Sequence, residues 1–368
     1  MNIHSALKKE GIKVIKPLNT LTINKLAKTI TDKLCLAFLE YGLDAEDLFI
    51  NLSRTKMFLA EMPDTLSKAK YYYRNDSIYF DHRLEMSEIE DLSIHECLHF
   101  IQKILDNKGN MIRLGLCLFP ESKSLGIALN EAAVQIMSCV ANKKKLDTVK
   151  YYNISLPTIS PTSYPLECSI VSQMAYFTGD YPLYHSTLNS NDIFQNTFSV
   201  KSSFHTFEEI RNELDILLQL EDELQTIIYE LTTSDGNMKK IQRLNKEIEY
   251  GKNLIKNSFF HMQDLIILNC FTSEFNSIKT LEDVEIFKTR LKEYSSFIGH
   301  ADDYTFYENF CLSMMAEIER KVNYIEEYGS LDLIGSLNPG MALIPSVKKG
   351  LSIFKRILIT LGILVEKN

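Results

Sequence analysis

The stretch from Ser87 to Leu105 reads SEIEDLSIHECLHFIQKIL, and its acidic start gives way to a regular apolar pattern. Ser87 and Glu90 form an S-x-x-E capping box, which favours the start of a helix. Apolar residues then recur at helical spacing as far as Leu105, and the turn-forming residues 106–109 follow as a stop. The sequence therefore predicts an amphipathic helix over this stretch.

Inside the stretch, His95, Glu96 and His99 form an H-E-x-x-H arrangement. Two histidines at this spacing project from one face of a helix, so both imidazoles can reach a single Zn²⁺ ion at about 2.1 Å. Glu96 is turned away by roughly 100° and is better placed to take a proton from a water on that ion. The pattern predicts a metal site, with two structural histidines on an amphipathic helix as the alternative.

A second acidic position lies in residues 125–137, whose composition is helical. Glu131 is the only charged residue between Lys123 and Lys143. A carboxylate on an otherwise apolar helix is costly to bury unless a cation meets it, and zinc would be that cation. Gln135 lies one turn further on and could hydrogen-bond the outer nitrogen of a ligating histidine. The alternative for Glu131 is a salt bridge to a lysine or arginine elsewhere.

Residues 95–99, together with the later sequence Asn-Glu-Ala at residues 130–132, resemble the gluzincin branch of the zinc metallopeptidases, of which thermolysin is the best-known member. The resemblance implies His95, His99 and Glu131 as zinc ligands and Glu96 as the general base of peptide-bond hydrolysis. The likeness is narrow, because it runs only from His95 to Gln135.

Two departures from the gluzincin pattern are visible. Gln135 stands where the family has an aspartate that steadies a ligand histidine, and the stretch between the two ligand helices is longer than in thermolysin. The metzincin pattern is excluded, because Gln102 and Leu105 occupy the positions of its glycine and its third histidine.

Composition narrows the class of protein. The chain has 368 residues, 45% hydrophobic content and a net charge of −8, with no basic aromatic module, which argues against nucleic-acid binding. Its seven cysteines include no C-x-x-C pair, so no disulfide framework is indicated. Residues 1–20 lack the apolar run of a signal peptide, and we expect a cytoplasmic protein. Abundant Ile, Lys and Asn without Trp is typical of a low-GC bacterium.

We expect an α+β protein that is predominantly helical, with a zincin-like core, a small sheet and an added helical-hairpin region. The expected parts are N-terminal helices in residues 1–60, a zincin-like catalytic core in 61–200, a helical region in 201–335 with an antiparallel hairpin at 207–259, and a linker and basic, apolar tail in 336–368.

Two helices are expected near the N-terminus, over residues 22–41 and 44–53. Aromatic and β-branched residues on either side of an Asn-Asp turn then predict strands around residues 71–73 and 78–80. In zincins a strand just before the metal helix forms the upper rim of the cleft, where substrate backbone can pair. We expect residues 78–80 to be this rim, with an ordinary core strand as the alternative.

The segment after Glu131 should contain a donor for the oxyanion of the reaction, usually a tyrosine or histidine in peptidases of this type. Residues 151–164 are rich in proline and serine and predict a loop, and residues 180–185 predict a turn. Tyr181, Tyr184 and His185 are the candidates there, and we choose His185. The alternative is a surface-loop histidine without a catalytic role.

Residues 207–259 form two apolar heptad arms of opposite charge joined by a Gly-containing turn. This pattern predicts an antiparallel helical hairpin, which either braces the catalytic part or recruits a partner, with bracing as the default. Residues 348–365 combine basic and apolar residues but are too short to span a bilayer. They could lie on an anionic membrane surface or dock onto the body.

The function that these features favour is zinc-dependent hydrolysis of a peptide or protein substrate, with Glu96 as the base. A second hypothesis is a zinc-binding, non-catalytic scaffold that acts through its helical hairpin. A third is a metal-dependent hydrolase of a non-peptide amide, because the zinc chemistry would be the same. The sequence leaves the oligomeric state open.

Overall fold

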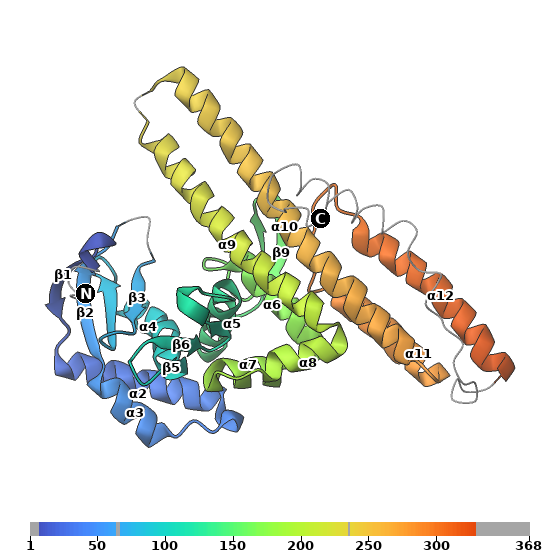
Figure 1. Cartoon of the computed structure of the whole chain (residues 1–368), viewed down its shortest axis with the longest axis horizontal. Helices are drawn as coiled ribbons and strands as arrows, with labels where there is room; N and C mark the ends of the chain where they lie inside the picture. Colours follow the sequence, from blue (N-terminus) through green and yellow to red (C-terminus); the bar gives the residue numbers. More distant parts are fainter. Residues whose placement is uncertain (1–6, 64–66, 235, 329–368) are drawn as a thin grey trace.

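The computed structural model describes residues 7–63, 67–234 and 236–328, and it confirms the predicted α+β, predominantly helical class (Figure 1). A small four-stranded sheet and its helices occupy one end of the molecule, and long helices occupy the other (Figure 1). The strands of this sheet are β1 (Lys13–Pro17), β2 (Lys56–Glu61), β3 (Ala69–Tyr72) and β4 (Ser77–Asp81), in the order β1-β2-β4-β3.

The two N-terminal helices are present as α2 (Thr20–Ala37) and α3 (Ala45–Arg54). The side chain of Asn19 accepts a hydrogen bond from a backbone N–H of α2, and Asp44 does the same for α3. Both helices therefore begin at residues whose side chains satisfy free N–H groups.

The expected rim strand is a core strand, so the prediction for residues 78–80 is wrong and its alternative is right. β4 lies between β2 and β3, and every residue from Ser77 to Asp81 is buried. The edge next to the histidine helix is β3, which pairs only with β4 among the described strands. Three aromatic or aliphatic residues in a row fit a strand that is covered on both faces.

The histidine helix is α4 (Met86–Gln102), and its ends differ from the prediction. The N–H of Glu85 donates to the Glu88 carboxylate at 2.9 Å, so the capping box lies two residues earlier than expected. At the other end, Lys103–Leu105 leaves the helix and forms strand β5. β5 pairs with β6 (Met111–Leu114), which pairs with β7 (Cys117–Leu118), so a small three-stranded sheet lies between the histidine helix and the helix that carries Glu131.

The segment that follows contains more regular structure than the sequence predicts. α5 (Ile127–Ala141) is followed by a strand hairpin, β8 (Asp147–Tyr151) and β9 (Ile154–Thr158), where a loop was expected. Then come α6 (Pro165–Thr178), α7 (Asp180–Asn189) and α8 (Ile193–Lys201). The turn expected at residues 180–185 is therefore the start of a helix. Pro182 favoured a turn in the sequence, but it lies in the first turn of α7, where proline is tolerated.

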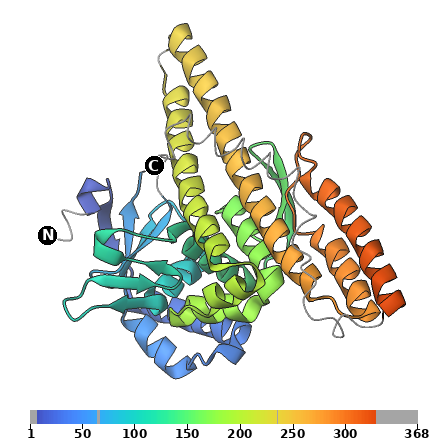
Figure 2. The ribbon, with the colours of Figure 1, turned by 45° about the vertical axis from the view of Figure 1, so that its right-hand side comes forward.

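The predicted helical hairpin is present and is longer than expected. α9 (Phe204–Thr232) and α10 (Met238–Ser277) pack side by side, and their joined ends project beyond the body in two views (Figures 1 and 2). An ion pair of 2.9 Å between Lys240 and Glu230 joins the two arms near the turn, as their opposite charges suggested. Two more helices, α11 (Leu281–Tyr294) and α12 (Phe306–Tyr328), lie beyond the base of α10.

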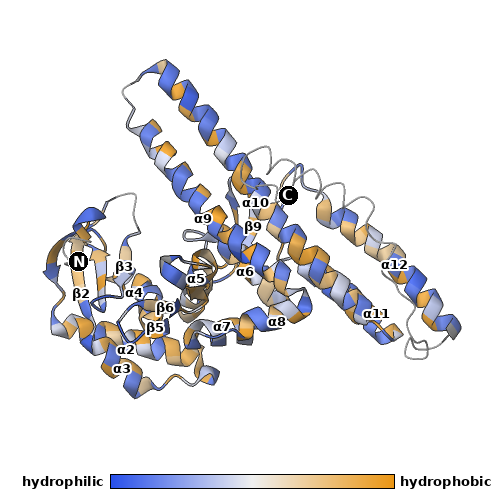
Figure 3. Cartoon of the chain, viewed as in Figure 1, coloured by the Kyte–Doolittle hydropathy of each residue, from blue (hydrophilic) through white to orange (hydrophobic). Residues whose placement is uncertain are grey.

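One large hydrophobic core joins α5 and α6 to the long helices, and a second joins α2, α3, α4 and the sheet. α5 contributes side chains to both cores, and most of its residues are apolar (Figure 3). Because the large core contains residues from both sides of residue 200, the division into domains stays a prediction. The tail at 348–365 lies outside the described residues, and among the described helices none has the length and apolarity to cross a membrane.

Candidate metal centre

α4 presents both histidines of the H-E-x-x-H arrangement on its buried face. His95 and His99 are 8% and 6% exposed, and their rings lie 4.8 Å apart between centroids. The two Nε2 atoms are 3.1 Å apart. The four-residue spacing on a helix thus brings two imidazole nitrogens to one point, as predicted.

α5 crosses this face and brings Glu131 to the same point. One carboxylate oxygen lies 3.2 Å from His95 Nε2, and the other lies 3.3 Å from His99 Nε2. One ligand atom from each of the three residues lies within 4.8 Å of the others. The structure therefore brings together the three residues predicted as ligands, in an arrangement that could hold a metal ion.

Two glutamines fix how the histidine rings are protonated. His99 Nδ1 faces Gln102 Oε1 at 3.2 Å, because the Gln102 amide nitrogen donates to the carbonyl of Thr187. His95 Nδ1 faces Gln135 Oε1 at 2.9 Å, because the Gln135 amide nitrogen donates to Ser160. Each amide oxygen can only accept, so each Nδ1 carries the proton and each neutral Nε2 presents a lone pair.

This protonation pattern tests whether the site suits a cation. Two Nε2 lone pairs and a carboxylate converge at 3.1 to 3.3 Å, and between neutral imidazoles and an anion such contacts are repulsive. A cation shared among them removes the repulsion. Two imidazoles and one carboxylate are a donor set that Zn²⁺ uses in catalytic sites. The residues therefore fit a metal ion of this kind.

Without a metal, a proton shared among these groups would have to remove the repulsion. Burial is the largest single effect and disfavours the imidazolium of His99. The charge and hydrogen bond of Glu131, with smaller effects of Glu96 and Gln102, together outweigh burial and raise the pKa of His99 to about 9. Burial raises the pKa of Glu131, yet the two histidines more than offset it and hold that pKa far below its usual range. Metal binding at neutral pH should therefore release a proton.

Glu96, the predicted base, is buried beside the triad but is not part of it. Its side chain is turned toward strand β3, where the backbone N–H of Tyr71 donates to its carboxylate at 2.6 Å. A charge-assisted hydrogen bond of this kind holds the carboxylate in one position. The edge strand and the histidine helix are thus joined at the predicted base.

The sequence analysis missed Tyr164, which lies at the triad. Its ring stacks on His95, with 6.3 Å between centroids and 19° between planes. The charge of Glu131, then burial and the charge of Glu96, raise the pKa of Tyr164 well above its usual value, so its hydroxyl stays protonated. Tyr164 lies directly before Pro165 and has a φ of 53°, a left-handed conformation that is uncommon for a residue other than glycine. This conformation marks Tyr164 as unusual, but it cannot be read from the sequence.

His185, the predicted oxyanion donor, lies elsewhere on the surface of α7. Its Nδ1 is 3.1 Å from the side-chain nitrogen of Asn191, and its ring packs against Tyr181. Among the described residues, none of its hydrogen bonds reaches the triad or Glu96. Its catalytic role stays a prediction, and Tyr164 is better placed for it.

Asn130, next to Glu131, contacts residues that hold the site in place. Its side-chain oxygen accepts a hydrogen bond from the N–H of Leu116 at 3.0 Å and a longer one from Gln102. Gly115 makes room for this pair, because a Cβ there would lie 2.2 Å from the Asn130 oxygen and its φ is +56°. Asn130 therefore holds Gln102, which in turn holds His99.

Helix α9 fixes the start of the ligand helix. One oxygen of Asp215 accepts from the N–H of Gly126 at 2.7 Å, and the other accepts from Ala128 at 2.9 Å. These are free N–H groups at the N-terminus of α5, so Asp215 acts as a helix cap supplied from another element. Helix α9 of the hairpin therefore contacts the start of the helix that carries Glu131, and the bracing role expected for the hairpin stays a prediction.

Comparison with known proteins adds no relative: no family model, no curated protein and no solved structure matches this chain.

Proposed function

We propose that the chain is a zinc-dependent peptidase that hydrolyses bonds of a peptide or protein substrate. The observation that supports it most is the convergence of His95, His99 and Glu131 with a separate buried carboxylate, Glu96, beside them. A structural zinc site needs no such carboxylate and is usually closed by four protein ligands. Three ligands and a neighbouring base are what metal-assisted hydrolysis requires.

A zinc ion held by the three ligands would supply Lewis acidity, which polarises a carbonyl group and makes a water molecule easier to deprotonate. Glu96 accepts the proton of the attacking water and passes it to the leaving amine. Tyr164, kept protonated by the neighbouring carboxylates, donates a hydrogen bond to the oxygen that gains charge. Gln135 and Gln102 keep both rings in the ligating tautomer.

The edge of β3 is the place where this proposal puts the substrate backbone. β3 packs on α4, and Tyr71 joins it to Glu96. Extended peptides bind such edges through main-chain hydrogen bonds. A peptide paired with β3 would run past the base, which the predicted rim at residues 78–80 cannot offer because it is covered on both sides.

The test is Glu96→Gln, which keeps the shape of the side chain and removes its basicity. Metal analysis should give one zinc per chain in the wild type and in the variant, while cleavage of a peptide library, followed by mass spectrometry, should fall by at least a hundredfold. Glu90→Gln, a change of the same kind earlier on α4, is the control and should retain activity. Full activity of Glu96→Gln would reject the proposal, and cleavage of small N-acyl amides alone would assign a non-peptide substrate.

A second candidate is the zinc-binding scaffold that acts through its hairpin, and the exposed tip supports it. Tyr229 and Met238, on either side of the turn, are 52% and 66% exposed. Replacing residues 227–241 with a short glycine turn removes the tip and leaves the base of the hairpin in the large core. Retained hydrolysis favours the enzyme, whereas loss of a binding partner in a protein without hydrolysis favours the scaffold.

A further inference from the structure

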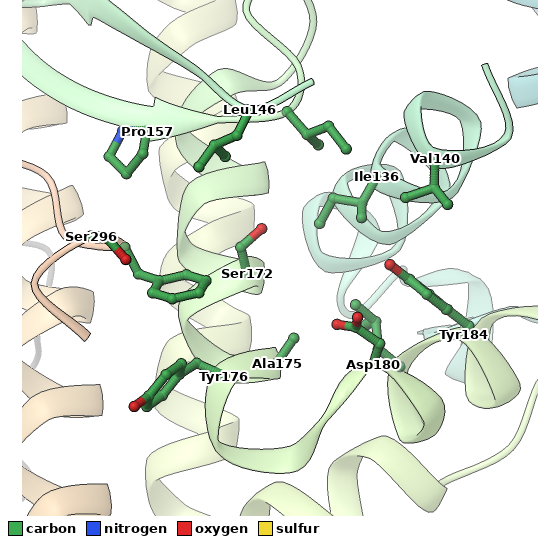
Figure 4. A pocket seen from close by; sticks show the side chains of 13 residues that line it. Ile136, Val140, Leu146, Pro157, Ser172, Ala175, Tyr176, Asp180, Tyr184 and Ser296 are labelled. Atoms are coloured by element: carbon green, nitrogen blue, oxygen red, sulfur yellow. The ribbon is translucent and has the colours of Figure 1, made fainter. Parts of the chain in front are cut away.

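A pocket of about 250 Å³ lies on the side of α5 that faces α6 and α7, and it contains none of the proposed metal ligands. β9 and residues 296–297 complete its walls. Figure 4 shows the side chains that line it, with Ile136 and Val140 from α5 on one side and Ala175 from α6 on another. Leu146 and Pro157 close it from above in this view (Figure 4). Its walls are therefore mainly apolar.

Three polar groups interrupt this apolar lining. The hydroxyls of Ser172 and Tyr184 and the carboxylate of Asp180 point into the space between α5, α6 and α7 (Figure 4). No hydrogen bond from these three groups to another described residue is present in the structure. The other hydroxyls of the lining are already used, because Tyr176 donates to the carbonyl of Arg290 and Ser296 donates to that of Glu293.

Asp180 carries the only formal charge of the lining. It forms no ion pair with a described lysine, arginine or histidine, and partial burial of its carboxyl raises its pKa. Its charge is felt by the hydroxyl of Tyr184, one turn further along α7, whose pKa it helps to raise. Asp180 is itself exposed, so its carboxylate lies where the apolar pocket meets solvent, and an unpaired carboxylate there attracts a cation that can also hydrogen-bond.

We propose that this pocket binds a small primary amine, in its ammonium form, on an apolar body of about ten non-hydrogen atoms. An ammonium has three N–H donors, and the pocket offers three free acceptors, of which one is charged. The size follows from comparison with cavities of known contents: about 150 Å³ holds benzene, so about 250 Å³ holds a body of roughly ten atoms. The proposal is independent of the metal site.

The charge requirement separates this ligand from others of the same size. A carboxylate of equal length would be repelled by Asp180, and a quaternary ammonium would have the charge but no N–H donor. The position of Asp180 in the first turn of α7 also stabilises that helix without any ligand. If that were its entire role, the residue would not affect amine binding.

The experiment is a calorimetric titration of the full chain with n-octylamine, with methyl NMR spectra to locate the ligand. We expect saturable binding to one site, with shifts at Ile136, Val140 and Leu183. Octanoate and octyltrimethylammonium should each bind at least tenfold more weakly. Absence of saturable octylamine binding at millimolar concentration would overturn the proposal, as would equal binding of octanoate.

Two variants complete the test. Asp180→Asn should lower the affinity for octylamine at least tenfold. Glu282→Gln, which changes an exposed acid in the first turn of α11, should leave this affinity unchanged. Ser172→Phe should block the pocket and remove the binding. Unchanged affinity in Asp180→Asn would overturn the assignment of the cation site, and this holds even if Ser172→Phe fails to fold.

Discussion

At the scale of single residues, Gln135 is the most informative member of the site. It fixes the protonation of His95 on one side and hydrogen-bonds Ser160 on the other. A neutral amide orients the ring as an aspartate would, but it adds no negative charge to the imidazole. The glutamine therefore holds the ring of His95 in place without adding a negative charge beside it.

Gln135→Ala should lower zinc affinity by about 10- to 100-fold, because His95 loses the acceptor that holds its Nδ1 proton. Competition with a chromophoric chelator measures this affinity. Gln219→Ala on the exposed face of α9 is the control and should leave it unchanged. Equal affinity in wild type and Gln135→Ala would show that His95 is oriented by other contacts.

Glu167 on α6 and Glu221 on α9 form a second unusual group, and neither belongs to the triad. They are 0% and 8% exposed, and both oxygens of Glu167 lack a hydrogen-bond partner. Burial raises the pKa of both carboxyls, and the charge of Glu167 adds to the effect on Glu221. The pair is therefore protonated in the folded protein at a pH where the unfolded chain has lost these protons.

The sign of the pH effect follows from this difference in proton binding. The stabilising contribution of the pair is complete below pH 4.5, the ordinary pKa, and it is lost as pH rises through the raised pKa values. Glu221→Gln removes one of the two groups, so the variant should be more stable than wild type at pH 8, by about 1 to 3 kcal/mol. Denaturant unfolding between pH 5 and pH 9 measures this, with Glu326→Gln as the exposed control. A variant less stable at pH 8 would contradict the prediction.

At the scale of elements, regular patterns were predicted well and distant contacts were not. The histidine helix was identified because its apolar period is local, yet its end at Gln102 depends on Lys103 pairing with Leu114. The loop expected over residues 151–164 contains β9, which is held partly by a bridge from Ser155 to His300. A partner that lies far along the chain leaves no trace in a local pattern.

In the candidate site, too, some residues could be predicted from local sequence patterns and others could not. His95, His99 and Glu131 were found because a helix period and a lone charge on an apolar helix are visible in sequence. Tyr164 was not, because a strained turn places it there, and tyrosines are common in this chain, with 18 in total. The tertiary fold alone distinguishes it from the others.

The cap that Asp215 provides to α5 can be tested against an ordinary cap. Asp215→Ala should cost about 1 kcal/mol of stability and should also weaken zinc binding, because the helix that carries Glu131 loses its anchor. Asp44→Ala removes the cap of α3 at a similar cost and should leave zinc affinity unchanged. If the two variants bind zinc equally well, the hairpin does not position Glu131.

At the scale of the whole molecule, α5 is the element that the two large cores share. Ala132 and Ile136 belong to the core of the long helices, whereas Val134 and Met137 belong to the core of the sheet and α4. A metal ion held by α4 and α5 would therefore tie the sheet end of the molecule to the helix on which the long helices rest. Metal binding should affect the stability of the body more than that of the projecting hairpin.

Zinc removal tests this link between the site and the fold. Zinc at about 100 times its dissociation constant should stabilise the folded chain by roughly 2.7 kcal/mol, so chelation should lower the melting temperature by several degrees. Hydrogen exchange should then increase in α4 and α5 and change little near the tip of the hairpin. Chelation should lower the melting temperature of Glu96→Gln as much as that of the wild type, because Glu96 is not a proposed ligand. Chelation should leave the melting temperature of His99→Ala unchanged. A melting temperature insensitive to chelator in all three proteins would mean that the convergence of His95, His99 and Glu131 holds no metal.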